Sequence, residues 1–185
     1  TKTFIKYDEQ LDLETRDNDE TRVLVGVVWE STAATTGFAK VGYKEKDFDN
    51  EARGTFYGTD WEVGIDWQPV SYSTVRISTS ADTFETNGEG DFIRAKNYTV
   101  RWNNDWLERV STSFSVTQQN DEYVFNELDI VNRDDELMNY SAALNYRARR
   151  WLKFSTFYQY TDRDSNRDTI GYDRSEVGVT VEVTL

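Results

Sequence analysis

The chain has 185 residues, carries a net charge of −13 and contains neither cysteine nor histidine. Its length suits one domain, residues 1–185. The missing residue types exclude disulfides, thiolate chemistry and every catalytic dyad or triad that depends on imidazole. The acidic balance argues against nucleic acid, because phosphate backbones are bound by clusters of Lys and Arg. No apolar run approaches the roughly 20 residues of a membrane-spanning helix.

Apolar and polar residues alternate along most of the chain, which is typical of strands whose side chains point to opposite faces in turn. The clearest case is the last segment, where Val177, Val179 and Val181 share one face and Glu176 and Glu182 share the other. The same pattern predicts ten strands. In chain order they lie around residues 2–13, 23–29, 38–46, 61–67, 75–81, 98–102, 110–116, 140–146, 152–160 and 177–185.

Short and long connections alternate between these strands. The short ones are residues 31–36, 68–73, 103–108 and 147–150, and the long, acidic ones are residues 14–20, 45–58, 85–92, 118–136 and 161–171. Short turns at one rim and long polar loops at the other are typical of outer-membrane barrels. The sequence therefore predicts an all-β, antiparallel up-and-down transmembrane barrel with about ten strands in this chain.

Aromatic residues recur on the apolar face just before each short turn. An amphipathic ring at that depth is what a membrane interface favours. The predicted interface girdle comprises Trp29, Trp67, Trp102, Trp106, Tyr146 and Trp151.

Two soluble folds also fit alternation of this kind. A propeller blade has a similar period, but it needs four short strands where this chain has two long ones. A β-sandwich usually has strands of about five or six residues, shorter than the roughly 9–11 of a membrane strand. The soluble alternatives remain open at this point.

The C-terminal stretch carries a resemblance to a known family. The run Tyr160-Thr-Asp-Arg-Asp-Ser165, followed by Gly171-Tyr-Asp-Arg174 and an alternating last strand, resembles bacterial outer-membrane β-barrel porins associated with exopolysaccharide or capsule biosynthesis. The resemblance implies an outer-membrane location, and family members are often longer, so this chain can be the C-terminal part of a larger barrel. The last strand also looks like the signal read by the outer-membrane assembly machinery, in Gly178, Val181, Val183 and Leu185, although that signal usually ends in Phe.

If the apolar faces contact lipid, the opposite faces line the lumen. The predicted lumen residues are Glu30, Lys40, Glu62, Asp66, Arg76, Arg101, Arg109, Arg147, Lys153, Glu176 and Glu182. Charges of both signs can line an aqueous channel. In ten strands closed alone they are expected to fill the interior as a salt-bridged plug, whereas a larger barrel favours the channel.

Two loops raise further hypotheses. Asp162, Asp164, Asn166 and Asp168 alternate like calcium ligands, but Arg167 and Asp173 stand where an EF-hand needs Gly and Glu, which favours a solvated loop. The longest loop contains the apolar residues Tyr123, Val124, Phe125, Leu128, Ile130 and Val131. These predict a loop that packs on its own barrel, enters the lumen or contacts a partner.

The resulting interpretation is a porin-like outer-membrane protein, or one that serves export or surface display of exopolysaccharide, with no catalytic role and no cofactor. Expected partners are outer-membrane lipid, polysaccharide and the assembly machinery. The alternative is a soluble or surface carbohydrate-binding β-domain. A glycoside hydrolase based on two carboxylates is the weakest reading, because no spacing singles out a pair.

Overall fold

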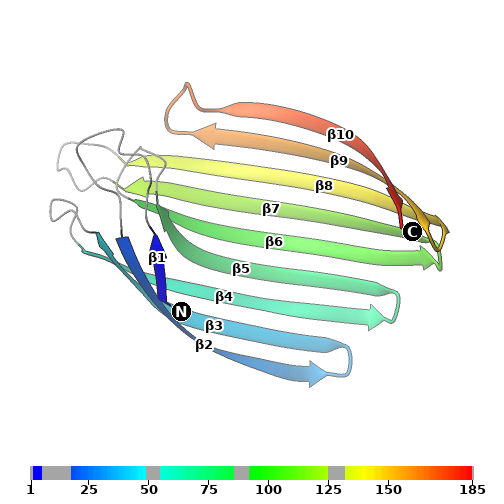
Figure 1. The fold of residues 1–185 in the computed structure, drawn as a ribbon, viewed down its shortest axis with the longest axis horizontal. Helices are drawn as coiled ribbons and strands as arrows, with labels where there is room; N and C mark the ends of the chain where they lie inside the picture. Colours follow the sequence, from blue (N-terminus) through cyan, green and yellow to red (C-terminus); the bar gives the residue numbers. More distant parts are fainter. Residues whose placement is uncertain (1, 6–17, 49–54, 86–91, 125–131, 185) are drawn as a thin grey trace.

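The described part of the chain forms one antiparallel sheet in which each strand pairs with the next. The computed structural model describes residues 2–5, 18–48, 55–85, 92–124 and 132–184. They contain ten strands in the order of the sequence (Figure 1). The strands are β1 (Lys2–Ile5), β2 (Asn18–Thr32), β3 (Thr35–Phe48), β4 (Thr55–Val70), β5 (Ser73–Glu85), β6 (Phe92–Leu107), β7 (Val110–Val124), β8 (Arg133–Arg149), β9 (Leu152–Ser165) and β10 (Tyr172–Val183). The predicted all-β, up-and-down topology is confirmed.

The connections divide between the two rims as predicted. Pairs of residues, 33–34, 71–72, 108–109 and 150–151, link the strands at the short-turn rim, on the right in Figure 1. The third turn was predicted at residues 103–108 and that placement is wrong: β6 continues to Leu107, and Glu108 and Arg109 make the turn. Asn103, Asn104 and Asp105 look like turn residues in sequence, but they pair in register with β7.

The strands run longer than predicted at the loop rim. From β2 to β10 they have 12 to 17 residues, against the roughly 9–11 needed to cross hydrocarbon. Parts of the predicted loops 45–58, 118–136 and 161–171 are therefore strand, and Tyr123 and Val124 belong to β7. The strand ends cannot be recognised in the sequence, because both of their faces carry polar or charged residues and the apolar–polar alternation is lost there.

The sheet curls into a trough and is open among the described residues (Figure 1). β1 has four residues and pairs only with residues 18–21 of β2. β10 pairs with β9 alone. An open sheet of this curvature has the form of a partial barrel.

Little of this sheet forms a dry core. Ala95 and Tyr123 are the buried apolar residues among those described, whereas 34 large apolar side chains are exposed. None of the described residues forms a helix that could cross a membrane. Stability must therefore come from strand pairing and from contacts within each face.

Aromatic rings lying over glycines provide one such contact. Trp29 covers Gly37, Phe38 covers Gly64, and Phe157 covers Gly178 across neighbouring strands. A Cβ added at Gly178 would lie 2.1 Å from the Phe157 ring. Each glycine leaves the space its partner ring occupies, an arrangement that fixes register between neighbouring strands.

Candidate functional site: the concave wall

The register places most apolar members of β2 to β10 on the convex face, whereas Leu24, Val28 and Phe157 lie on the opposite one. Val27 pairs with Ala39, which pairs with Val63, and the same face continues to Val177 on β10. Val27 is 61% exposed and Val177 is 75% exposed. A continuous exposed apolar face of this size requires an apolar environment or a partner.

Aromatic residues bound this face at both rims. The six predicted girdle residues lie at the short-turn rim, where the Trp102 ring stacks on Phe114 at 5.6 Å between centroids. The Trp102 and Trp106 indole N–H groups donate to Ser73 and Thr112, at 2.8 and 2.9 Å. A second row, which sequence reasoning missed, stands toward the loop rim. It contains Tyr43, Tyr57, Tyr98, Tyr140 and Tyr160, with Tyr43 stacked on Tyr57 at 6.1 Å.

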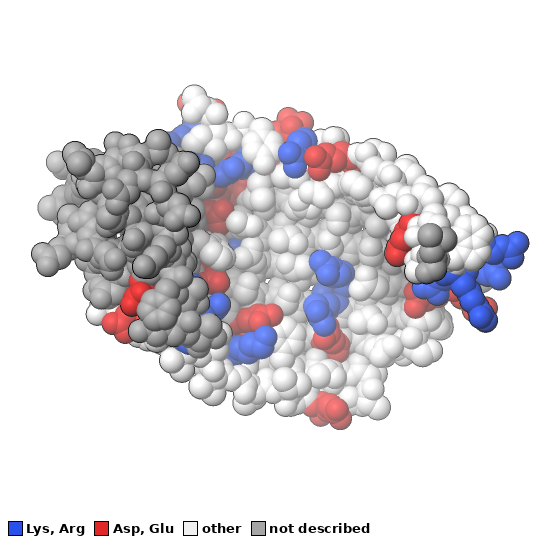
Figure 2. All heavy atoms as spheres, in the orientation of Figure 1, with Lys and Arg blue, Asp and Glu red and all other residues white. Residues whose placement is uncertain are grey.

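The predicted lumen residues share the opposite, concave side of the trough. Figure 2 shows this hollowed side, on which Lys, Arg, Asp and Glu gather. Ten of the eleven lie in strands, at positions that alternate with the apolar residues of the convex face, and Arg109 lies in the β6–β7 turn. Three ion pairs join members of the set: Lys40 to Glu62 at 2.8 Å, Arg76 to Asp66 at 2.5 Å, and Lys153 to Glu182 at 3.5 Å. The Arg76 pair is bidentate, with a second bond of 2.7 Å.

A charged cluster that sequence reasoning missed crosses β2 to β5 on the concave side. Arg22 contacts Asp60 at 2.8 Å, and the Lys44 ammonium lies 2.7 Å from Asp82. Lys44 also donates to the Thr83 carbonyl at 2.8 Å. The Asp60 side chain is 1% exposed. Because the partners come from different strands, only the register could have revealed them.

A second missed cluster lies at the loop rim on β7 to β9. The Arg133 guanidinium donates two hydrogen bonds to Asp135, at 2.9 and 2.5 Å, and Arg163 donates a third. Arg133 also lies over the Tyr123 ring, 4.1 Å from its centroid. Burial alone would raise the pKa of Asp135, but the hydrogen bonds from Arg133, Ser165 and Arg163 outweigh it and lower that pKa to about 2. The carboxylate therefore stays ionised at neutral pH.

Uncharged polar side chains line the concave side of β6 to β9 between these charged groups. Thr99 bonds to Thr117 at 3.2 Å, and Ser115 bonds to Ser141 at 2.7 Å. Ser155 donates to Asn145 at 2.8 Å. These cross-strand pairs form a hydroxyl and amide ladder, a surface that offers donors and acceptors to water or to a hydroxyl-rich solute.

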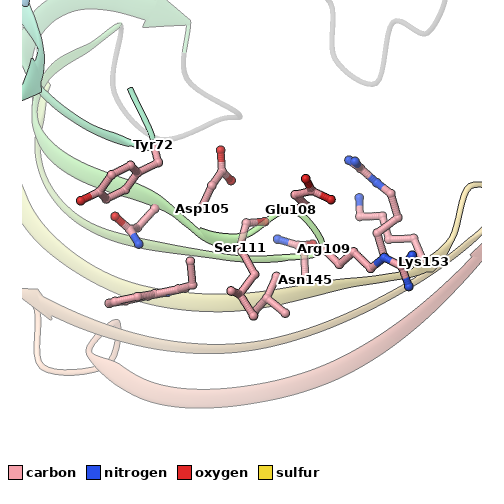
Figure 3. A pocket seen from close by; sticks show the side chains of 12 residues that line it. Tyr72, Asp105, Glu108, Arg109, Ser111, Asn145 and Lys153 are labelled. Carbon is pink, nitrogen blue, oxygen red and sulfur yellow. The ribbon is translucent and has the colours of Figure 1, made fainter. Parts of the chain in front are cut away.

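A hollow of about 730 Å³ opens on the concave side at the short-turn rim. Figure 3 shows Tyr72 and Asp105 toward one end of it and Lys153 toward the other, with Ser111 and Asn145 between them. Arg109, Arg147, Glu108 and Asn104 also line it, together with Trp106, Leu107 and Val110. Of the predicted lumen residues, the structure brings Arg109, Arg147 and Lys153 together here.

The remaining predicted sites are placed as follows. Gly178, Val181 and Val183 lie in β10, and Leu185 lies outside the described residues. Asp162 and Asp164 lie in β9, and Asn166 follows it and bonds to the Asn132 carbonyl at 2.9 Å. No described group of three or more carboxylates is arranged to hold a metal ion, so the four calcium candidates are not brought together. Of the apolar loop, residues 125–131 lie outside the described part.

The chain matches the model of a known protein family. A family model described as "Putative beta-barrel porin 2" matches residues 5–185. No curated protein and no solved structure matches the chain.

Proposed function

The chain belongs to the putative beta-barrel porin 2 family, and from that premise we propose that it forms the wall, or part of the wall, of an aqueous pore through a bacterial outer membrane. The pore carries hydroxyl-rich solute, in the first place exopolysaccharide on its way to the surface. The observation that carries the proposal is the contrast between the faces: exposed aliphatic side chains outside, and paired charges with a hydroxyl and amide ladder inside.

The open sheet supports a channel over a plug. Ten strands closed alone would leave an interior with room for little but side chains. Here β10 has no partner besides β9, and most of β2 has no partner besides β3, among the described residues, so closure by additional strands gives a wider lumen. The concave charges then stand around water, and charged rings of this kind set the selectivity of pores.

The membrane partners follow from the same arrangement. Outer-membrane lipid contacts the apolar face, and the aromatic rows mark its two interfaces. The last strand, with Gly178, Val181 and Val183, is the segment that the assembly machinery recognises. We expect no catalytic role and no cofactor. A soluble carbohydrate-binding domain is less favoured, because the exposed apolar face of β2 to β10 would need to be covered.

The test is conductance in planar bilayers by the purified, refolded chain. Pore formation is expected, and Ser115→Trp should reduce the unitary conductance because Ser115 lies on the concave side of β7. Val116→Trp, the neighbouring change on the convex side, is the matched control and should leave conductance unchanged. Protein that inserts into the bilayer as a closed barrel but never conducts would contradict the pore.

A further inference from the structure

The basic residues of the concave side differ in how they are neutralised. Toward the loop rim, Arg22, Lys44 and Arg163 each lie against a carboxylate, at separations of 2.8 Å for Arg22 and 2.7 Å for Lys44. At the short-turn rim, Arg109 and Arg147 form no ion pair with any carboxylate in the described part of the chain. In a chain of net charge −13, unneutralised cations are unexpected, and these gather at one hollow.

The charge around this hollow is predominantly positive. Arg109, Arg147 and Lys153 line it against two carboxylates, Asp105 and Glu108. Three further charges lie close by. Arg149 ends β8 two positions after Arg147, Arg150 begins the adjoining β8–β9 turn, and Glu182 takes part of the charge of Lys153 at 3.5 Å. Figure 2 shows blue side chains clustered at this end of the molecule. A concave surface with an excess of one sign concentrates solutes of the other.

The hollow is built for more than a small ion. Its volume of about 730 Å³ lies within the usual range for organic ligands. Ser111 and Asn145 stand beside the cations and offer neutral donors and acceptors, and Tyr72 provides a ring with a hydroxyl. Guanidinium groups bind carboxylates through paired N–H donors, while hydroxyls and amides bind sugar hydroxyls.

We propose that this hollow, in the short-turn mouth of the lumen, binds glycans that carry carboxylate groups. Arg109 and Arg147 bind the carboxylates, and Ser111 and Asn145 bind neighbouring hydroxyls. The inference rests on the proposed function and narrows its substrate from hydroxylated solute to acidic glycan. Entry from this rim would deliver the chain to the hydroxyl and amide ladder of β6 to β9.

Binding is measured by titration calorimetry on the full chain folded in zwitterionic micelles, so that no pore is required. The probes are a galacturonate oligosaccharide and a neutral maltose oligosaccharide of equal length. The acidic oligosaccharide should bind about tenfold or more tightly than the neutral one, and the double change Arg109→Gln with Arg147→Gln should weaken it about tenfold or more. The double change Arg94→Gln with Lys96→Gln removes the same two positive charges from the convex side of β6 and should leave binding unchanged.

Each other outcome overturns the inference. Equal binding of the two oligosaccharides would show that charge plays no part. Equal weakening by the control pair Arg94→Gln with Lys96→Gln would show that only net charge matters. Sodium sulfate and excess free galacturonate are compared as competitors of the acidic oligosaccharide at matched ionic strength. If sulfate displaces it as effectively as galacturonate does, the hollow is a general anion site. A heat-dependent shift in electrophoretic mobility will show whether the Arg109→Gln, Arg147→Gln variant is folded. If that variant does not fold, Lys153→Gln is measured in its place.

The same variants separate this inference from the proposed pore. Conducting pores without preference for the acidic oligosaccharide would refute the acidic-glycan site and leave the pore intact. Binding of the acidic oligosaccharide in micelles without conductance in bilayers would refute the pore and leave the acidic-glycan site intact.

Discussion

Asp135 is predicted to hold the loop rim of β7 to β9 together. Its side chain is 2% exposed and accepts hydrogen bonds from Arg133 and Arg163. It lies beyond the apolar band, because its outward-facing neighbours Asp134 and Glu136 are charged. The pKa of Asp135 falls from 3.8 to about 2, which at about 1.4 kcal/mol per pKa unit corresponds to about 2.5 kcal/mol of stability. Asp135→Asn should lower the free energy of unfolding by at least this amount, since it also leaves two guanidinium groups without their carboxylate.

The pH dependence follows from the sign of the shift. A pKa lowered on folding stabilises the protein fully above the unfolded value of 3.8 and loses that effect as the pH falls through about 2. The difference between wild type and Asp135→Asn, measured by urea unfolding in lipid vesicles with tryptophan fluorescence, should be constant from pH 5 to 8 and shrink below about pH 4. Asp134→Asn is the exposed neighbouring control. A difference of less than about 0.5 kcal/mol at pH 7 between the two variants would refute the reasoning.

Three other perturbations give sharp expectations. Gly178→Ala should cost about 1–3 kcal/mol, because its Cβ would meet the Phe157 ring at 2.1 Å. This loss of stability should shrink when Phe157→Leu is added. Gly171→Ala, whose added Cβ has its nearest contact at 3.2 Å, should destabilise the protein less. Equal urea midpoints for the two glycine variants would contradict this. A double-mutant cycle of Asp66→Asn and Arg76→Gln should give a coupling of about 0.5–1 kcal/mol, since the Arg76 side chain is 51% exposed, and no coupling would show that the pair is incidental. Val27→Arg should cost about 2–4 kcal/mol in vesicles, because it places a charge in the lipid, while an unchanged unfolding curve would argue against lipid contact there.

The fold could be predicted from the sequence because the alternation survives wherever one face is apolar. The run from Val23 to Trp29 and the run from Val177 to Val183 each placed a strand and its faces correctly. The same rule failed at strand ends such as Arg133 to Glu136, where both faces are polar and the pattern cannot be told from a loop. It failed again at Asn103 to Asp105, whose residue types favour turns but whose backbone pairs with β7.

The concave wall could be predicted in its membership but not in its contacts. Parity along a strand indicates which residues share a face, and it placed Asp66 and Arg76 there. Which cation meets which carboxylate depends on register between strands, as in Lys44 and Asp82, which are 38 residues apart in the chain. The openness of the sheet and the hollow at the short-turn rim are likewise set by curvature, which alternation does not specify.

The proposed pore requires that the convex face contacts lipid and that the concave face contacts water. The chain has no cysteine, so single cysteines can be introduced along residues 113–117 of β7 and spin-labelled in vesicles. We predict that labels at positions 114 and 116 collide preferentially with oxygen dissolved in lipid, and that labels at 113, 115 and 117 collide with an aqueous nickel chelate. Equal access of both sets to the aqueous reagent would contradict the membrane barrel.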